Sequence, residues 1–155
     1  MDFVRRPQNV HVYHYRMGIA RQYEYAMLQR SDNPLYWQGV SGGVRDKETP
    51  KQAALRVSAY EAGTPANSTI YEQHFKTFLP RTIFSGVDWH QDILLVPQYY
   101  FAIPFSGNLR LSEQHTAYKW CGYEEAMRLI YWQSQQTALF ELNGLLLAGK
   151  IPGVS

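Results

Sequence analysis

The sequence has a single cysteine, Cys121, in 155 residues. One thiol cannot form an internal disulfide, so stability has to come from a hydrophobic core, which a chain of this length can bury. Cys121 lies beside Trp120 without a clear basic partner, which favours a structural thiol over a nucleophile. Apolar segments such as LLLAG are short, far below the roughly 20 residues of a membrane span. The opening MDFVRRPQNV has no apolar stretch after its basic residues, which predicts no signal peptide.

Charge is also scarce, at 18% of residues and a net +2. So small an excess does not predict binding to nucleic acid or to a membrane. A lone thiol fits a reducing compartment. We therefore expect a cytoplasmic protein with one domain spanning residues 1–155. Aromatic residues are plentiful instead, at 15% with twelve Tyr and four Trp, which indicates strands and flat-ring binding surfaces.

Alternating segments rich in β-branched and aromatic residues predict a sheet. The expected strands cover residues 9–16, 23–30, 35–40, 68–79, 93–105 and 116–122. Turn residues separate them, and the strand over 35–40 is expected to end at Ser41-Gly42-Gly43.

One helix is predicted over residues 49–62 by signals at both ends. Thr49 and Gln52 have the spacing of a capping box. Pro50 stands at the first helical position, where its missing N–H costs nothing, and Gly63 can adopt the left-handed conformation after the last turn.

Two further helices, over residues 123–130 and 135–149, are predicted by apolar spacing. The order of strands, one helix, more strands and C-terminal helices predicts an α+β fold arranged as an α/β/α sandwich around a central mixed sheet. No internal repeat is visible.

The segment GGVRDKETPKQAALRVSAYEAGT, residues 42–64, resembles the Nudix box, G-x5-E-x7-R-E-U-x-E-E-x-G-U, where U is a bulky aliphatic residue. The matching positions are Gly42, Glu48, Arg56, Glu61 and Gly63. The flanking segments MLQRSDNPLYWQGVSGG and EQHTAYKW extend the resemblance to nearly the whole chain. The segments RRPQNVHVYHYR and AYKW look most like the branch that cleaves dihydroneopterin triphosphate and dATP.

The chain departs from this pattern where the family has carboxylates. Val57 and Tyr60 replace two glutamates, and Ser58 and Thr64 occupy the aliphatic positions. Residues at i, i+3 and i+4 of a helix share a face, so that face presents Val57, Tyr60 and Glu61. The family often has a further glutamate where this chain has Gln114, and an amide cannot act as a base at neutral pH.

The resemblance implies a Nudix-type α/β/α sandwich that takes Mg²⁺ and a nucleotide or other diphosphate-containing small molecule, and it leaves a homodimer open. It assigns metal binding to the Gly42 carbonyl and Glu61. The implied catalytic residues are Glu61, Glu48 and Arg56, with an Arg56–Glu48 ion pair fixing the loop on the helix. The implied substrate-binding residues are Arg5, Trp37 and Lys119.

Two functions remain open. One carboxylate out of three on the helix face favours a weak or inactive domain that binds a ligand or has a regulatory role, since a fold does not guarantee its usual chemistry. The alternative is an active Mg²⁺-dependent pyrophosphohydrolase in which Asp46 or Glu113 replaces a missing carboxylate.

Other polar clusters are given simpler interpretations. Asp88, His90 and Asp92 stand at period two and could share one face of an extended segment as a small metal cluster, but a solvated loop is the expected structure. His11 and His14 are three apart in a predicted strand, so they are expected to point to opposite faces.

Overall fold

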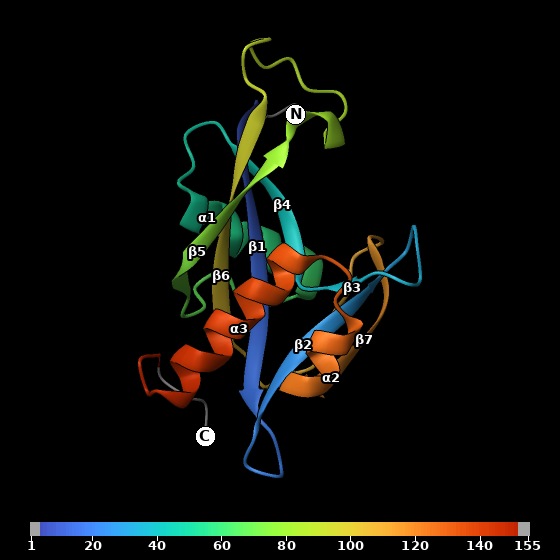
Figure 1. The fold of residues 1–155 in the computed structure, drawn as a ribbon, viewed down its shortest axis with the longest axis vertical. Coiled ribbons are helices and arrows are strands. Elements are labelled where there is room, and N and C mark those ends of the chain that lie inside the picture. The colour runs from blue at the N-terminus through green and yellow to red at the C-terminus, as the bar shows by residue number, and fades with distance from the viewer. Residues whose placement is uncertain (1–3, 152–155) are drawn as a thin grey trace.

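The computed structural model describes residues 4–151, which form a mixed sheet with helices on both faces (Figure 1). The strands are β1 (Arg5–Met17), β2 (Tyr23–Arg30), β3 (Trp37–Gln38), β4 (Val40–Arg45), β5 (Tyr71–Pro80), β6 (Leu95–Pro104) and β7 (His115–Gly122). The helices are α1 (Pro50–Ala62), α2 (Tyr123–Leu129) and α3 (Gln133–Leu147), with a 3-10 turn at Arg81–Ile83. The terminal residues 1–3 and 152–155 of the expected domain lie outside the described part.

The long strand β1 organises the sheet. It runs parallel to β6 along one edge, and its other edge pairs antiparallel first with β4 and then with β2. Strand β5 pairs with β6, and β2 carries both β3 and β7. The sheet is therefore mixed, as expected. In Figure 1, α3 crosses one face of this sheet and α1 lies behind it.

Two cores fill the spaces between the sheet and its helices. Val10 and Val12 of β1 pack toward α1, whereas Tyr13 and Tyr15 pack toward α2 and α3. This alternation follows from the period of two along a strand. The predicted α/β/α sandwich is confirmed. None of the helices within residues 4–151 is long and apolar enough to cross a membrane.

The two β1 histidines follow the same alternation. His14 Nε2 lies 2.7 Å from Ser58 Oγ on α1, whereas the His11 ring packs against Tyr13 and Tyr100 on the opposite face. The prediction that these histidines point apart is confirmed, which excludes them as a paired site.

Helix α1 begins and ends where its sequence signals predict. The Thr49 side chain accepts a hydrogen bond from the Gln52 backbone N–H, and the Gln52 side chain accepts one from the Thr49 N–H. At the other end, Gly63 has a φ of 76° and its N–H donates to the Ala59 carbonyl. The capping box and the left-handed C-terminal glycine are both confirmed.

Removing the Thr49 hydroxyl should weaken this helix start. We expect Thr49→Ala to lower the free energy of unfolding by about 1 kcal/mol, because an orphan N–H of the first turn loses its acceptor. Chemical denaturation would measure the loss. Thr49→Ser is the matched control, since it keeps the hydroxyl. An equal loss in both variants would contradict the capping role.

One sequence prediction is corrected by the structure. The strand expected over residues 35–40 is two strands, β3 and β4, and the glycines expected to end it lie inside β4. Gly42 and Gly43 pair with Val10 and Asn9 of β1. Glycine is needed at 42 because an added Cβ would lie 2.6 Å from Val57 Cγ2. Gly42 thus marks a close approach of strand and helix, which turn chemistry alone does not reveal.

Candidate functional site

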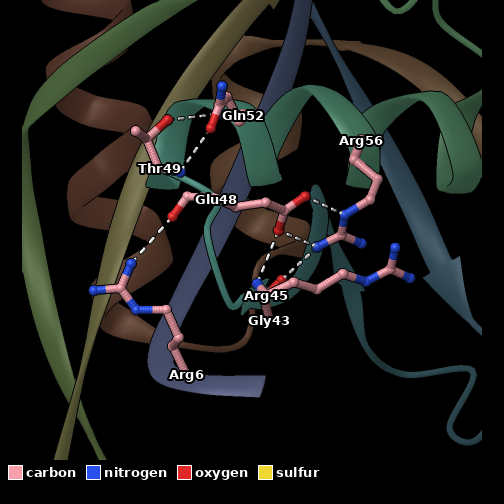
Figure 2. Close-up of polar contacts among 7 residues, drawn as sticks. All are labelled: Arg6, Gly43, Arg45, Glu48, Thr49, Gln52 and Arg56. Carbon is pink, nitrogen blue, oxygen red and sulfur yellow. Dashed lines mark hydrogen bonds and ion pairs between the residues drawn. The ribbon is translucent and has the colours of Figure 1, made fainter. Parts of the chain in front are cut away.

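The loop between β4 and α1 is held on the helix by the predicted ion pair. Arg56 Nε donates to Glu48 Oε2 at 2.7 Å, and Arg56 Nη2 donates to Glu48 Oε1 at 2.9 Å and to the Gly43 carbonyl at 2.8 Å. The Arg45 backbone N–H donates to Glu48 Oε1 at 2.8 Å. Figure 2 shows the bonds from Arg56 and from the Arg45 N–H meeting at the Glu48 carboxylate, with a further bond from Arg56 to the Gly43 carbonyl.

This geometry confirms the expected Arg56–Glu48 contact. Hydrogen bonding from Arg56 is the main cause that lowers the pKa of Glu48, and the Arg45 N–H adds to the effect. A planar guanidinium matches a carboxylate in two parallel bonds, which fixes the angle between loop and helix. The Arg56–Glu48 pair therefore holds the β4–α1 loop against the helix.

Val57, at the first replaced carboxylate position, is part of the core. Its side chain is 4% exposed, packs with the cluster between sheet and α1, and points at Gly42 of β4. The resemblance assigns the carbonyl of the same Gly42 to metal binding, and a glutamate in place of Val57 would carry a charge close to this residue. Valine replaces that charge with an apolar contact.

Tyr60, at the second replaced position, behaves differently because 62% of it is exposed. Its hydroxyl donates to the Glu113 carboxylate, 3.1 Å from Oε1 and 3.3 Å from Oε2. The hydrogen bond to Glu113 is also the main cause that raises the pKa of Tyr60. The aromatic residue thus ties the loop before β7 to α1.

Glu61, the remaining carboxylate, is 8% exposed and accepts a hydrogen bond from Ser112 Oγ at 2.6 Å. His115 Nδ1 lies 3.7 Å from Glu61 Oε2, which is too long for a hydrogen bond, and that ring nitrogen is buried without a partner among the described residues. His115 Nε2 lies 3.4 Å from Gln38 Nε2. The Glu61 side chain, which was predicted to bind metal, therefore has Ser112 and His115 as its polar neighbours.

Two adjoining hollows open on this face of the protein and share Ser41 and Glu61. The larger, about 460 Å³, is lined by Ser41, Gly42, Arg45, Arg56, Val57, Tyr60 and Glu61. The smaller, about 310 Å³, is lined by Arg30, Gln38, Ser41, Glu61, Gln114 and His115. Together they form a polar depression running from the β4–α1 loop to the start of β7.

The donors at this depression do not fit a divalent metal held in the Nudix manner. Mg²⁺ takes near-octahedral oxygen ligands, and the helix face offers Glu61 beside a buried Val57 and a hydrogen-bonded Tyr60. No three His, Cys, Asp or Glu side chains within residues 4–151 are grouped so as to hold a metal ion. Asp46 is exposed and lines neither hollow.

The residues predicted to contact substrate lie elsewhere. Trp37 packs toward α2 and α3, and Lys119 Nζ sits 5.2 Å from the centre of its ring and 3.3 Å from Glu125 Oε2. Arg5 donates to Asn9 and stacks over Phe84 at 4.9 Å. None of the three predicted residues lines the two hollows. Their binding role stays a prediction.

Several residues of the depression were missed by sequence reasoning. These are Gln38, Ser41, Arg45, Ser112 and His115. Ser112 lies in a loop with no periodic pattern, so nothing in its neighbourhood signals the contact with Glu61. Arg45 could have been found, because a cation next to the loop that carries Glu48 is a natural candidate for an anion site.

The remaining polar candidates agree with their simpler interpretations. Asp88, His90 and Asp92 are exposed in the loop between β5 and β6, with His90 Nδ1 3.6 Å from Asp92 Oδ2. Cys121 is buried, and burial is the main cause that raises the pKa of its thiol to about 12. A thiol protonated at neutral pH is a poor nucleophile.

Comparison with known proteins shows the family of this chain. The NUDIX domain model matches residues 8–142. The dihydroneopterin triphosphate diphosphatase of Escherichia coli K12 is 29% identical over 141 residues, covering 85% of this chain and 89% of the enzyme. The asymmetrical bis(5'-nucleosyl)-tetraphosphatase of Sus scrofa is 28% identical over 118 residues, covering 76% and 77% of the two chains.

Solved structures agree. A NUDIX-family protein from Listeria monocytogenes superposes with a TM-score of 0.83 at 30% identity, over 96% of this chain and 100% of that one. The E. coli dihydroneopterin triphosphate pyrophosphohydrolase superposes with a TM-score of 0.72 at 25% identity, over 92% and 99% of the two chains. The chain therefore belongs to the NUDIX domain family.

Proposed function

We propose that this chain is a NUDIX domain that binds a nucleotide or another diphosphate-containing small molecule and hydrolyses it weakly or not at all. One observation carries the proposal: the helix face that holds carboxylates in the resembling box is occupied by a packed Val57 and by Tyr60 bonded to Glu113. Phosphoryl transfer depends on positioned cations and an oriented nucleophile. A binding surface needs neither.

The two hollows support the binding half of the proposal. Their volumes, about 460 and 310 Å³, fall in the range of small-molecule sites. Their shared wall at Ser41 and Glu61 lets one ligand extend from the β4–α1 loop toward Gln38 and Gln114. A diphosphate in the larger hollow would leave the smaller one for the group attached to it.

The names of similar proteins suggest ligands to try. Relatives are named for dihydroneopterin triphosphate and for bis(5'-nucleosyl) tetraphosphates. The NUDIX domain of Shewanella oneidensis NrtR, which shares the fold at 12% identity and a TM-score of 0.68, was solved with ADP ribose. These compounds all contain linked phosphates, which is the shared chemistry that we propose for this chain. We also place the protein in the cytoplasm, where its lone reduced thiol fits, and leave a homodimer open.

A second function is favoured by Glu113. Its carboxylate reaches α1 through the Tyr60 hydroxyl, two positions before the His115 that faces Glu61. In an active Mg²⁺-dependent pyrophosphohydrolase, Glu113 and Glu61 would supply the oxygen ligands that Val57 and Tyr60 cannot. Asp46, the other candidate replacement, lines neither hollow.

Binding and turnover should separate experimentally. We expect calorimetry to detect binding of ADP ribose, diadenosine tetraphosphate or a nucleoside triphosphate. Hydrolysis of these compounds with Mg²⁺ or Mn²⁺, followed by chromatographic separation of the products, should stay well below the roughly 1 to 10³ s⁻¹ of typical enzymes. Glu113→Gln should leave that basal rate unchanged. A typical enzymatic rate in the wild type, lost in Glu113→Gln, would establish the second function instead.

A further inference from the structure

The loop between β6 and β7 is tied to the last turn of α1 through three consecutive helix residues. In chain order along the helix, the hydrogen-bonded pairs are Tyr60 with Glu113, Glu61 with Ser112, and Ala62 with Arg110. The Ala62 pair joins two backbones, whereas the other two pairs use side chains. The side-chain contacts can therefore be removed by substitution while the backbone contact remains.

Ser112 makes two hydrogen bonds with one hydroxyl. It donates to Glu61 Oε2 at 2.6 Å, and its oxygen accepts from the Gln114 backbone N–H at 3.1 Å. Glu61 and Gln114 both line the smaller hollow. A hydrogen bond to a charged carboxylate is among the stronger hydrogen bonds of a protein. The Ser112 hydroxyl thus links two residues of the wall of this hollow.

Tyr60 adds a contact one position further along the loop. Its hydroxyl donates to the Glu113 carboxylate, 3.1 Å from Oε1 and 3.3 Å from Oε2. Tyr60 lines the larger hollow, whereas Gln114 and His115, which follow Glu113, line the smaller one. A carboxylate at position 60, as in the resembling box, would repel Glu113 and could not donate to it. The residue that replaces a box carboxylate is therefore a donor that holds this loop.

The same loop segment is held on its other side by Ser31, the residue after β2. The Ser31 backbone N–H donates to the Gln114 carbonyl at 2.9 Å, and its hydroxyl donates to the Glu113 carbonyl at 2.7 Å. These bonds join the loop to the end of β2 and do not involve α1. The width of the smaller hollow, from Gln114 to Glu61 on α1, consequently depends on the contacts of the loop with the helix.

From these contacts we infer that Tyr60 and Ser112 are positioning residues for the ligand. Their hydroxyls hold residues 112–115 against α1 and so form the wall of the smaller hollow before a ligand arrives. The inference rests on the proposed binding function and adds how the binding surface keeps its shape. A wall that is already ordered loses little conformational entropy when a ligand binds. Loss of either hydroxyl should therefore weaken binding even without a direct contact between that hydroxyl and the ligand.

Calorimetry with ADP ribose on single variants tests the inference. We expect Ser112→Ala to weaken binding about tenfold, because it removes both bonds of the hydroxyl. Tyr60→Phe should weaken binding about threefold, because its bond lies at the surface. Ser112→Thr keeps the hydroxyl and should keep the affinity. The matched controls are Ser106→Ala, in the same loop, and Tyr131→Phe, since both residues are exposed and neither hydroxyl has a hydrogen bond within the described residues.

Amide hydrogen exchange separates ordering of the loop from general stability. In Tyr60→Phe the Gln114 N–H keeps its acceptor, Ser112 Oγ. Faster exchange at Gln114 and His115 in this variant therefore reports a looser loop and not the loss of their own bonds. We expect that increase while the melting temperature stays close to that of the wild type. We also expect ADP ribose to slow exchange at the same two amides in the wild type.

The outcomes also separate the inference from the proposed function. Unchanged affinity in both Ser112→Ala and Tyr60→Phe, or wild-type exchange at Gln114 in Tyr60→Phe, would overturn the positioning role and leave the proposed function standing. Lost affinity that accompanies a lowered melting temperature, or an equal loss in the controls, would assign these residues to stability alone and also contradict the inference. If the wild type binds neither ADP ribose, diadenosine tetraphosphate nor a nucleoside triphosphate, the proposed function itself is wrong.

Discussion

Restoring the box carboxylates should create Mg²⁺-dependent pyrophosphohydrolase activity. We expect Val57→Glu with Tyr60→Glu, and with Gln114→Glu where needed, to raise pyrophosphate release from nucleoside triphosphates by roughly 10³-fold. The substituted face would offer three adjacent carboxylates, the oxygen ligands that Mg²⁺ prefers. Position 57 borders the larger hollow and 114 the smaller, so both can present a carboxylate to the same ligand.

A matched amide variant isolates the effect of charge. Val57→Gln with Tyr60→Gln has nearly the same shape as the glutamate pair but supplies no anionic oxygen. The expected order of rates is glutamate pair well above both amide pair and wild type. If the glutamate pair is folded and no faster than the amide pair, the missing carboxylates are not what limits this protein.

The two substitutions should differ in their cost to stability. Val57 is buried against Gly42, so a glutamate there places a charge beside packed apolar groups and should destabilise by about 1–3 kcal/mol without metal. Tyr60 is largely exposed, and its replacement removes only the surface bond to Glu113. Thermal melts should therefore show nearly all of the loss in the Val57→Glu single variant.

Mild acid should destabilise the protein strongly through its buried histidines. Burial lowers the pKa of His14 from 6.5 to about 4 and, with the nearby His14 and His115, lowers that of His11 to about 3. The unfolded chain therefore binds protons that the folded chain excludes as pH falls below about 6.5. Each histidine should make the free energy of unfolding about 2 kcal/mol smaller at pH 5 than at pH 7.5. Denaturant midpoints between pH 7.5 and 4.5 would measure the slope.

Glu48 affects stability at a lower pH than the two buried histidines do. Its lowered pKa means that its ion pair with Arg56 stabilises the fold above the ordinary value of 4.5 and loses that contribution only as pH falls further. Acid sensitivity between pH 6.5 and 5 is thus expected to come from His11 and His14, with the loop clamp contributing only in stronger acid.

His11→Phe should flatten this pH dependence. Neither ring nitrogen of His11 has a hydrogen-bond partner within the described residues, and the ring packs against Tyr13 and Tyr100. A phenyl ring keeps the packing and removes the titrating group, so about half of the slope should disappear. Replacement of the exposed His74 by Gln is the control. An unchanged slope in His11→Phe would show that His11 does not titrate on unfolding.

Much of the fold could be predicted because its signals are local. The cap residues Thr49 and Gln52, with Gly63 at the other end, fixed the limits of α1 within the chain, and hydrophobic alternation located β1 and β2. The β3–β4 division was missed because it depends on which strand the chain contacts, since β3 pairs with β2 and β4 pairs with β1. Such a contact leaves no periodic trace in the sequence.

The sequence by itself determined which charges the box retains. The spacing of Glu48 and Arg56 predicted their ion pair, and the residues at 57 and 60 showed that two carboxylates were replaced. These features belong to one loop and one helix, whose geometry is set by neighbours a few residues apart.

Only the tertiary structure decided what surrounds that box. Ser112 meets Glu61 across 51 positions of sequence, and Glu113 meets Tyr60 across 53. Their approach depends on the register of β7 against β2 and on the path of the loop before it, which no local pattern encodes. The same long-range packing buries Val57 and exposes Tyr60, although both stand on one helix face. Local spacing thus identifies the candidate site, and packing between distant segments determines whether it can hold a metal or an anion.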